Sequence, residues 1–148
     1  MTVITANEYQ EHRTMKITAQ TIVLLAAIVL PTTGWSDNWV NVPEGSEHQV
    51  DTDSITNSGV FVLAWVRSIY PLPMEFSGKL AYSEKSHISI GCAKKTQTTL
   101  QTITFADPNS TAPLNTFTGN PSPDSYRRPE PVEKVIQSFV CRVASQRR

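Results

Sequence analysis

The sequence has no excess of charge of either sign. Its 148 residues include 13 basic and 13 acidic side chains, so the formal net charge is zero. A protein that binds nucleic acid or another polyanion without specificity normally carries a large positive charge. We therefore expect no nucleic-acid partner.

The sequence also lacks the short motifs that mark common active sites. It contains no Gly-x-Ser-x-Gly nucleophile elbow and no glycine-rich phosphate-binding loop. Glu75 and Glu84 could serve as the paired carboxylates of a small hydrolase, but nothing in the sequence sets their separation. We expect solvated glutamates, no catalytic residues and no cofactor.

A metal site is not indicated either. His48, Asp51 and Asp53 lie close together, but a strand directs His48 and Asp51 to opposite faces. The run also lacks the glycine and the distal glutamate of a calcium loop. We interpret Asp51, Asp53 and Ser54 as solvated strand or turn positions, and we expect no metal.

Long apolar runs are scarce. Residues 17–30 are apolar but short for a membrane-spanning helix, follow basic residues and precede a small-x-small cleavage pattern that ends at Ser36. This pattern predicts a signal peptide within residues 1–36, with Met15 as an alternative start, and a single domain over residues 37–148. We expect export to the periplasm or the cell surface, with membrane contact only through the signal segment. A retained signal anchor is the alternative.

Cysteine occurs only twice, at Cys92 and Cys141. In an exported chain an even pair indicates a disulfide, and this one would close a loop of 49 residues, worth roughly 4 kcal/mol of stability. The alternative is a Cys-His nucleophile, because His87 lies five residues before Cys92. No third group that would orient the histidine stands at a recognisable position.

The longest apolar run after the signal segment, residues 60–70, predicts a central strand covered on both faces. Gly59 opens it, and Pro71 and Pro73 are expected to end it. One face is bulky and the other is small, so we expect a helix against one of them. The two faces carry, respectively, Phe61, Leu63, Trp65 and Ile69, and Val60, Val62, Ala64 and Val66.

Further alternating segments predict an antiparallel meander. Its other expected strands are residues 38–42, 48–55, 76–82, 87–92 and 96–105, with a turn at 56–59. Residues 107–131 contain six prolines and are expected to form a long mobile loop with no strand in the sheet.

The C-terminal segment predicts an amphipathic helix that begins near Pro131. Its apolar positions are Val132, Val135, Ile136, Phe139, Val140 and Val143. In an unbroken helix Cys141 points about 180° away from Val132. Either the helix ends or distorts near Phe139, in one variant by forming a short terminal strand over residues 138–143, or the Cys92 segment wraps over the outer side of the helix. We favour a helix with a frayed last turn.

The order of these features resembles the surface-adhesin protein E family of exported bacterial proteins. The resemblance rests on Asn38-Trp39-Val40, residues 50–55, the strand with Trp65 and Tyr70, Gly91-Cys92-Ala93-Lys94-Lys95 and the C-terminal run to Cys141. It implies an α+β fold in which a C-terminal helix is tied to an antiparallel sheet by a disulfide. It also implies attachment to host extracellular-matrix or serum proteins such as vitronectin and laminin, although this chain has no lipobox cysteine.

The expected function is therefore that of an exported, non-catalytic binding module with a protein or glycan partner, and a homodimer is possible. The alternatives are a periplasmic inhibitor of a hydrolase such as lysozyme, and a small periplasmic hydrolase. We expect Trp39, Trp65 and Tyr82 in the core. Basic side chains that could converge on heparan sulfate or lipopolysaccharide are Lys94, Lys95, Arg127, Arg128, Arg147 and Arg148.

Overall fold

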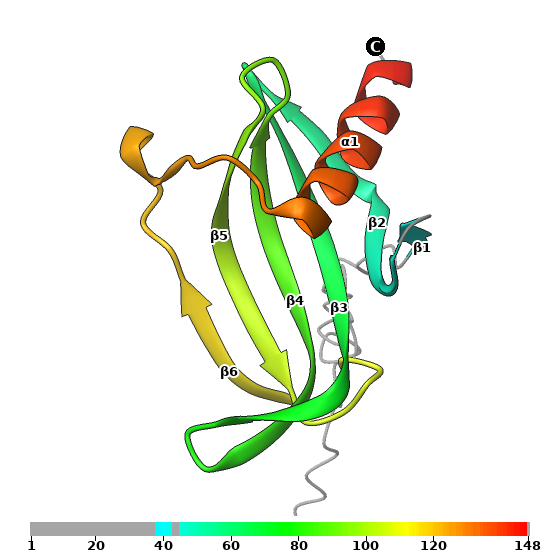
Figure 1. The fold of residues 1–148 in the computed structure, drawn as a ribbon, viewed down its shortest axis with the longest axis vertical. Coiled ribbons are helices and arrows are strands. Elements are labelled where there is room, and N and C mark those ends of the chain that lie inside the picture. The colour runs from blue at the N-terminus through cyan, green and yellow to red at the C-terminus, as the bar shows by residue number, and fades with distance from the viewer. Residues whose placement is uncertain (1–37, 43–44, 148) are drawn as a thin grey trace, which may run out of the picture. The chain divides into compact units, whose positions relative to one another are not determined.

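A computed structural model describes residues 38–42 and 45–147, so the predicted signal peptide lies outside the described residues. Within them, six strands are followed by a helix (Figure 1). The elements are β1 (Trp39–Val42), β2 (Gly45–Ser58), β3 (Phe61–Phe76), β4 (Lys79–Gly91), β5 (Thr96–Phe105), β6 (Pro113–Thr118), the short 3-10 helix η1 (Pro123–Ser125) and α1 (Pro131–Gln146).

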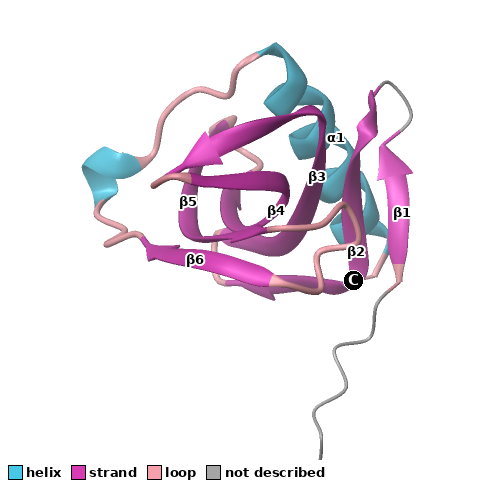
Figure 2. Ribbon diagram, turned by 90° about the horizontal axis from the view of Figure 1, so that it is seen from below, coloured by secondary structure: helices cyan, strands magenta, loops and turns pink. Residues whose placement is uncertain are grey.

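The strands form one sheet in the order β1-β2-β3-β4-β5-β6, and every neighbouring pair is antiparallel. The predicted meander and the α+β class are confirmed. Figure 2 shows how strongly the sheet curls.

The main core lies between one sheet face and α1. Val62, Ala64 and Val66 of β3 are buried on this face, as the two-residue period predicts. The small side chains leave room for the helix, so the expected helix covers the small face of the strand. The buried cluster consists of Val42, Val50, Ile55, Val62, Ala64, Val66, Ile88, Ile90, Ile136, Phe139, Val140 and Ala144.

Strand β3 differs from its prediction at both ends. Val60 lies in the turn before it and is 79% exposed, while the strand continues through Pro71 and Pro73 to Phe76. The prolines are tolerated because β2 pairs with β3 only as far as Ser68, and the β3–β4 register is irregular between Ile69 and Met74. Of the predicted strand at 76–82, Phe76 ends β3, residues 77–78 form the turn, and residues 79–82 begin β4, which also contains most of the predicted strand at 87–92. Residues 56–58, predicted as part of a turn, belong to β2.

The prediction of no strand between residues 107 and 131 is wrong, because β6 pairs with β5 there. Asp107 organises the connection: its Oδ2 accepts hydrogen bonds from the backbone N–H groups of Thr111 (3.0 Å) and Ala112 (2.7 Å). After β6 the chain stays close to β5, since a Cβ at Gly119 would lie 2.7 Å from the carbonyl oxygen of Thr99. Pro113, the one proline within β6, fits because β6 is an edge strand.

Helix α1 begins as expected and runs unbroken to Gln146, so the frayed last turn is wrong. Val132, predicted on the buried stripe, is 50% exposed. The helix instead presents Gln137 and Cys141, four residues apart and thus on one side, to the turn between β4 and β5. The Cys92 segment reaches this flank of the helix, which is the second geometry considered from the sequence.

Trp39, Trp65 and Tyr82 are only half-buried, so their expected core positions need correction. Trp39 and Trp65 lie on the sheet face opposite α1, whereas Tyr82 alternates with Ile88 and Ile90 on the other face. Trp65 stacks on the ring of His87 with centroids 4.8 Å apart. The guanidinium of Arg67 lies 4.9 Å from the centroid of Trp39. These rings form a second, thinner apolar layer and not the main core.

Candidate basic ligand-binding cleft

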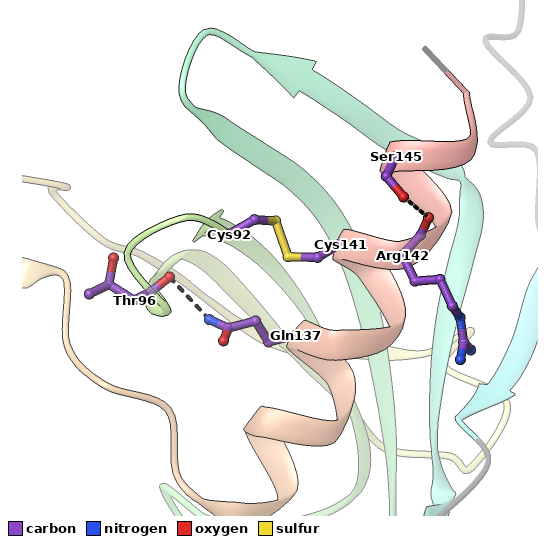
Figure 3. The surroundings of a disulfide bond; sticks show 6 residues. All are labelled: Cys92, Thr96, Gln137, Cys141, Arg142 and Ser145. Carbon is purple, nitrogen blue, oxygen red and sulfur yellow. Dashed lines mark hydrogen bonds between the residues drawn. A yellow bond between two sulfur atoms is a disulfide. The ribbon is translucent and has the colours of Figure 1, made fainter.

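The disulfide joins the β4–β5 turn to α1. Cys92 and Cys141 are bonded, with Cα atoms 5.9 Å apart, which confirms the predicted bridge and excludes a free Cys92 nucleophile. The side-chain amide of Gln137 donates to the carbonyl oxygen of Thr96 at 3.3 Å and ties the same two elements together (Figure 3). This part of the surface is therefore held at two points.

A cleft of about 600 Å³ lies beside the disulfide. Lysines on the turn form part of its lining, and the remaining cations come from the segment before α1 and from its first turns. Its lining comprises Cys92, Lys94, Lys95, Arg128, Pro129, Lys134, Gln137, Ser138 and Cys141. Four of these nine side chains are cations and none is a carboxylate, so the lining as a whole attracts anions.

Of the six basic residues named from the sequence, the structure places three, Lys94, Lys95 and Arg128, around one cleft. Lys134 lies with them, although it was not among the six. Lys134 lies in the first turns of a helix that begins at Pro131, close to the segment that bears Arg128. The predicted start of this helix was therefore the sequence signal that could have identified Lys134.

The other predicted cations are engaged elsewhere. Arg127 makes a two-pronged pair with Glu133, at 2.8 and 2.6 Å. Arg147 donates to the carbonyl oxygen of Thr52 at 2.8 Å and lies 3.9 Å from a carboxylate oxygen of Asp53. Arg148 lies outside the described residues.

The Arg127–Glu133 pair holds one wall of the cleft. The backbone of Arg127 also exchanges two hydrogen bonds with Gln97 of β5, at 2.9 and 3.0 Å, which places Arg128 immediately beside the sheet. The hydrogen bond from Arg127 lowers the pKa of the Glu133 carboxyl below its ordinary value of 4.5. Glu133 therefore pairs with Arg127, and neither residue lines the cleft.

Glu133→Gln should reduce stability at neutral pH by less than about 1 kcal/mol, because both partners are partly exposed. Since the folded-state pKa is lowered, the native pair stabilises the protein above pH 4.5, and this contribution is lost as the pH falls through the folded-state pKa. Unfolding free energies measured from pH 7 to pH 3 should converge for the two proteins. Glu75→Gln, on the exposed hairpin, is the control; a constant gap down to pH 3 would contradict the pair.

A second hollow, of about 370 Å³, lies on the opposite sheet face around Asp51, Ser54 and His87. Asp51 and Ser54 are less solvated than expected: Asp51 is 4% exposed, and burial raises its pKa. The Ser54 hydroxyl donates to the Asp51 carbonyl oxygen at 2.7 Å and accepts from the Trp65 N–H at 2.9 Å. Ser54 thus replaces a backbone hydrogen bond of the β2–β3 ladder where the register between the two strands shifts. In the same hollow, burial lowers the pKa of His87.

The two candidate hydrolase carboxylates are far apart. Glu84 lies opposite Ser68 and Glu75 opposite Leu80, so the two are four residues apart along the hairpin, about 13 Å. Paired glycosidase carboxylates lie within about 10 Å. Glu84 instead accepts a hydrogen bond from the Tyr70 hydroxyl at 2.8 Å, which contributes to a raised pKa of Tyr70 after the larger effect of burial.

His48 does not approach Asp51: its Nδ1 lies 3.0 Å from the Ser68 hydroxyl, on the sheet face opposite Asp51. Within residues 38–42 and 45–147, no group of three or more His, Cys, Asp or Glu side chains is placed to hold a metal ion. The same part of the chain contains no helix with the length and apolar character needed to cross a membrane.

The end of the β3–β4 hairpin, from Pro71 to Leu80, forms an apolar arm that was not expected from the sequence. It projects beyond the rest of the sheet (Figure 1). Four large apolar side chains on it are well exposed: Leu72 (77%), Met74 (49%), Phe76 (37%) and Leu80 (51%). Prolines assumed to end the strand concealed its continuation.

Solved structures share this fold. A crystal form of Haemophilus influenzae protein E matches with a TM-score of 0.55 at 10% identity, covering 73% of this chain and 90% of that one. Its selenomethionine form gives 0.53 at 11% identity, covering 71% and 86%. Among curated proteins, none matches this chain.

The fold and the cleft define a small α+β domain with a disulfide-tied helix and a cationic cleft. The family model for surface-adhesin protein E matches residues 39–142. The chain belongs to the surface-adhesin protein E family, as the motif resemblance implied. Membership supports a surface adhesin role, and it suggests an exported, non-enzymatic binding protein.

Proposed function

We propose that this protein is an exported adhesin that attaches to a host extracellular-matrix or serum protein, such as vitronectin or laminin, or to a glycan, through the basic cleft. The observation that carries the proposal is the gathering of Lys94, Lys95, Arg128 and Lys134 around one cavity with no carboxylate in its lining. The predicted signal peptide within residues 1–36 would direct the export.

The cleft suits recognition because its walls are fixed before a partner arrives. The disulfide and the Gln137–Thr96 hydrogen bond hold the turn that bears the lysines. The backbone bonds between Arg127 and Gln97 hold the wall that bears Arg128. A surface that is already ordered loses less conformational entropy on binding, so more of the electrostatic attraction remains as affinity.

The test compares two double variants that lower the net charge equally. Lys94→Ala/Lys95→Ala removes half of the cleft's cations, whereas Lys79→Ala/Arg142→Ala removes two exposed cations that do not line it. On immobilised vitronectin and laminin, the cleft variant should bind about tenfold more weakly than the parent, and the control variant should match the parent.

Equal losses in both variants would show that only net charge matters and would contradict a role for the cleft. No binding of the parent to either matrix protein or to glycans, together with inhibition of lysozyme, would favour the hydrolase-inhibitor alternative. Turnover of a peptidoglycan or ester substrate would favour the hydrolase.

A further inference from the structure

The four cations of the basic cleft come from three separately anchored parts of the chain. Lys94 and Lys95 lie in the β4–β5 turn, where Lys95 has a positive φ of 53°. Arg128 follows the residue that is bonded to β5, and Lys134 lies in the first turns of α1. These anchors fix the backbone positions from which the four like-charged side chains extend.

No carboxylate lines the cleft beside these cations. The nearby Glu133 carboxylate accepts two hydrogen bonds from Arg127 and a third, at 2.7 Å, from the backbone N–H of Glu130. The cleft therefore keeps several uncompensated positive charges around about 600 Å³ of space, which is within the size range of small-molecule and cofactor sites. A ligand with several anionic groups would gain from all of them together.

The kind of cation indicates the kind of anion. Three of the four side chains are lysines, whose ammonium groups act as point charges with three rotatable donors. Arginine is over-represented where a carboxylate or a phosphate is bound by two parallel hydrogen bonds, and only Arg128 can do this here. Lysine binds phosphate as a point charge without a fixed geometry, so a lysine-rich lining accommodates tetrahedral oxyanions, which present three oxygens without a fixed plane.

We propose that the cleft binds a glycan that carries sulfate or phosphate monoester groups, with Lys94, Lys95 and Lys134 contacting successive oxyanions and Arg128 at the rim. The inference rests on the proposed function, since it names the ligand class of the same surface. A sulfated matrix polysaccharide and a phosphorylated lipopolysaccharide sugar present this shared chemistry.

The experiment measures the affinity of the protein for a heparin dodecasaccharide at several NaCl concentrations. Each cation that displaces a counterion adds nearly one to the slope of log Kd against log salt, so the slope should approach four. Lys94→Ala/Lys95→Ala should lower the slope by about two, and Lys79→Ala/Arg142→Ala should leave it unchanged.

Three further ligands test which anionic group the cleft recognises and which kind of glycan carries it. De-sulfated heparin and poly-glutamate, which retain carboxylates, should bind at least tenfold more weakly than heparin. A phosphorylated lipopolysaccharide core oligosaccharide is compared with heparin, and the tighter of the two identifies the source. Equal affinity for poly-glutamate and heparin, or a slope that the cleft variant leaves unchanged, would overturn the inference.

Failure of the glycan inference can be distinguished from failure of the proposed function. Binding of vitronectin or laminin that depends on Lys94 and Lys95, without binding of heparin or the phosphorylated oligosaccharide, would leave the adhesin role in place and remove the glycan ligand.

Discussion

Replacing both cysteines by alanine should lower the free energy of unfolding by about 4 kcal/mol. The bridge from Cys92 to Cys141 closes a loop of 49 residues, which includes β5, β6 and most of α1. Without it, the unfolded chain recovers the conformational freedom that this loop had lost. The measurement is denaturant unfolding of the two proteins under oxidising conditions.

Reduction supplies the matched control. A thiol reductant should bring the parent to the stability of the double variant and leave the variant unchanged, because the variant has no bridge to lose. Equal unfolding midpoints for the oxidised parent and the variant would show that the helix does not depend on the link.

Ile90→Ala should cost about 3 kcal/mol, within the range for truncating a buried isoleucine. Ile90 of β4 is completely buried in the cluster beneath α1, so the missing atoms leave a cavity that the sheet backbone cannot close. Leu72→Ala is the control: it removes a similar volume from a side chain that is 77% exposed and should change stability by less than about 0.5 kcal/mol.

The two variants are compared by urea unfolding with the slope of the transition recorded. Similar costs for Ile90→Ala and Leu72→Ala would mean either that the core lies elsewhere or that the apolar arm is packed in solution. Trp65 is a less informative choice than the sequence indicated, because it is half-buried on the opposite sheet face.

The sequence predicted most of the fold because periodicity is a local property. Val62, Ala64 and Val66 alternate, and Ile136, Phe139 and Val140 recur at helical spacing, so each element could be recognised by itself. The disulfide was predictable since only two cysteines occur. Errors arose where pairing overrides local preference: Pro71 and Pro73 lie in a strand because no β2 neighbour needs their N–H groups there.

The site was harder to predict because it depends on tertiary neighbours. Lys94 and Lys95 are adjacent in sequence, but Arg128 reaches them only through the bonds between Arg127 and Gln97, which join residues 30 positions apart. No local pattern marks that contact. Lys134 was missed for the same reason, and Arg147 was included although it is bound to Thr52 at the far end of the helix.

The strand order has a consequence for how the chain folds. Each strand pairs with the one before it, so every hairpin closes over a short stretch of backbone. The contacts of α1 with β1, β2 and β3 join more distant parts of the chain. Arg147, directly after α1, bonds to Thr52 across 95 positions. Because contacts between distant residues carry the largest entropic cost of closure, docking of α1 onto the sheet should be the slow step of folding. A chain truncated before α1 would leave the apolar face of its sheet exposed and prone to aggregate.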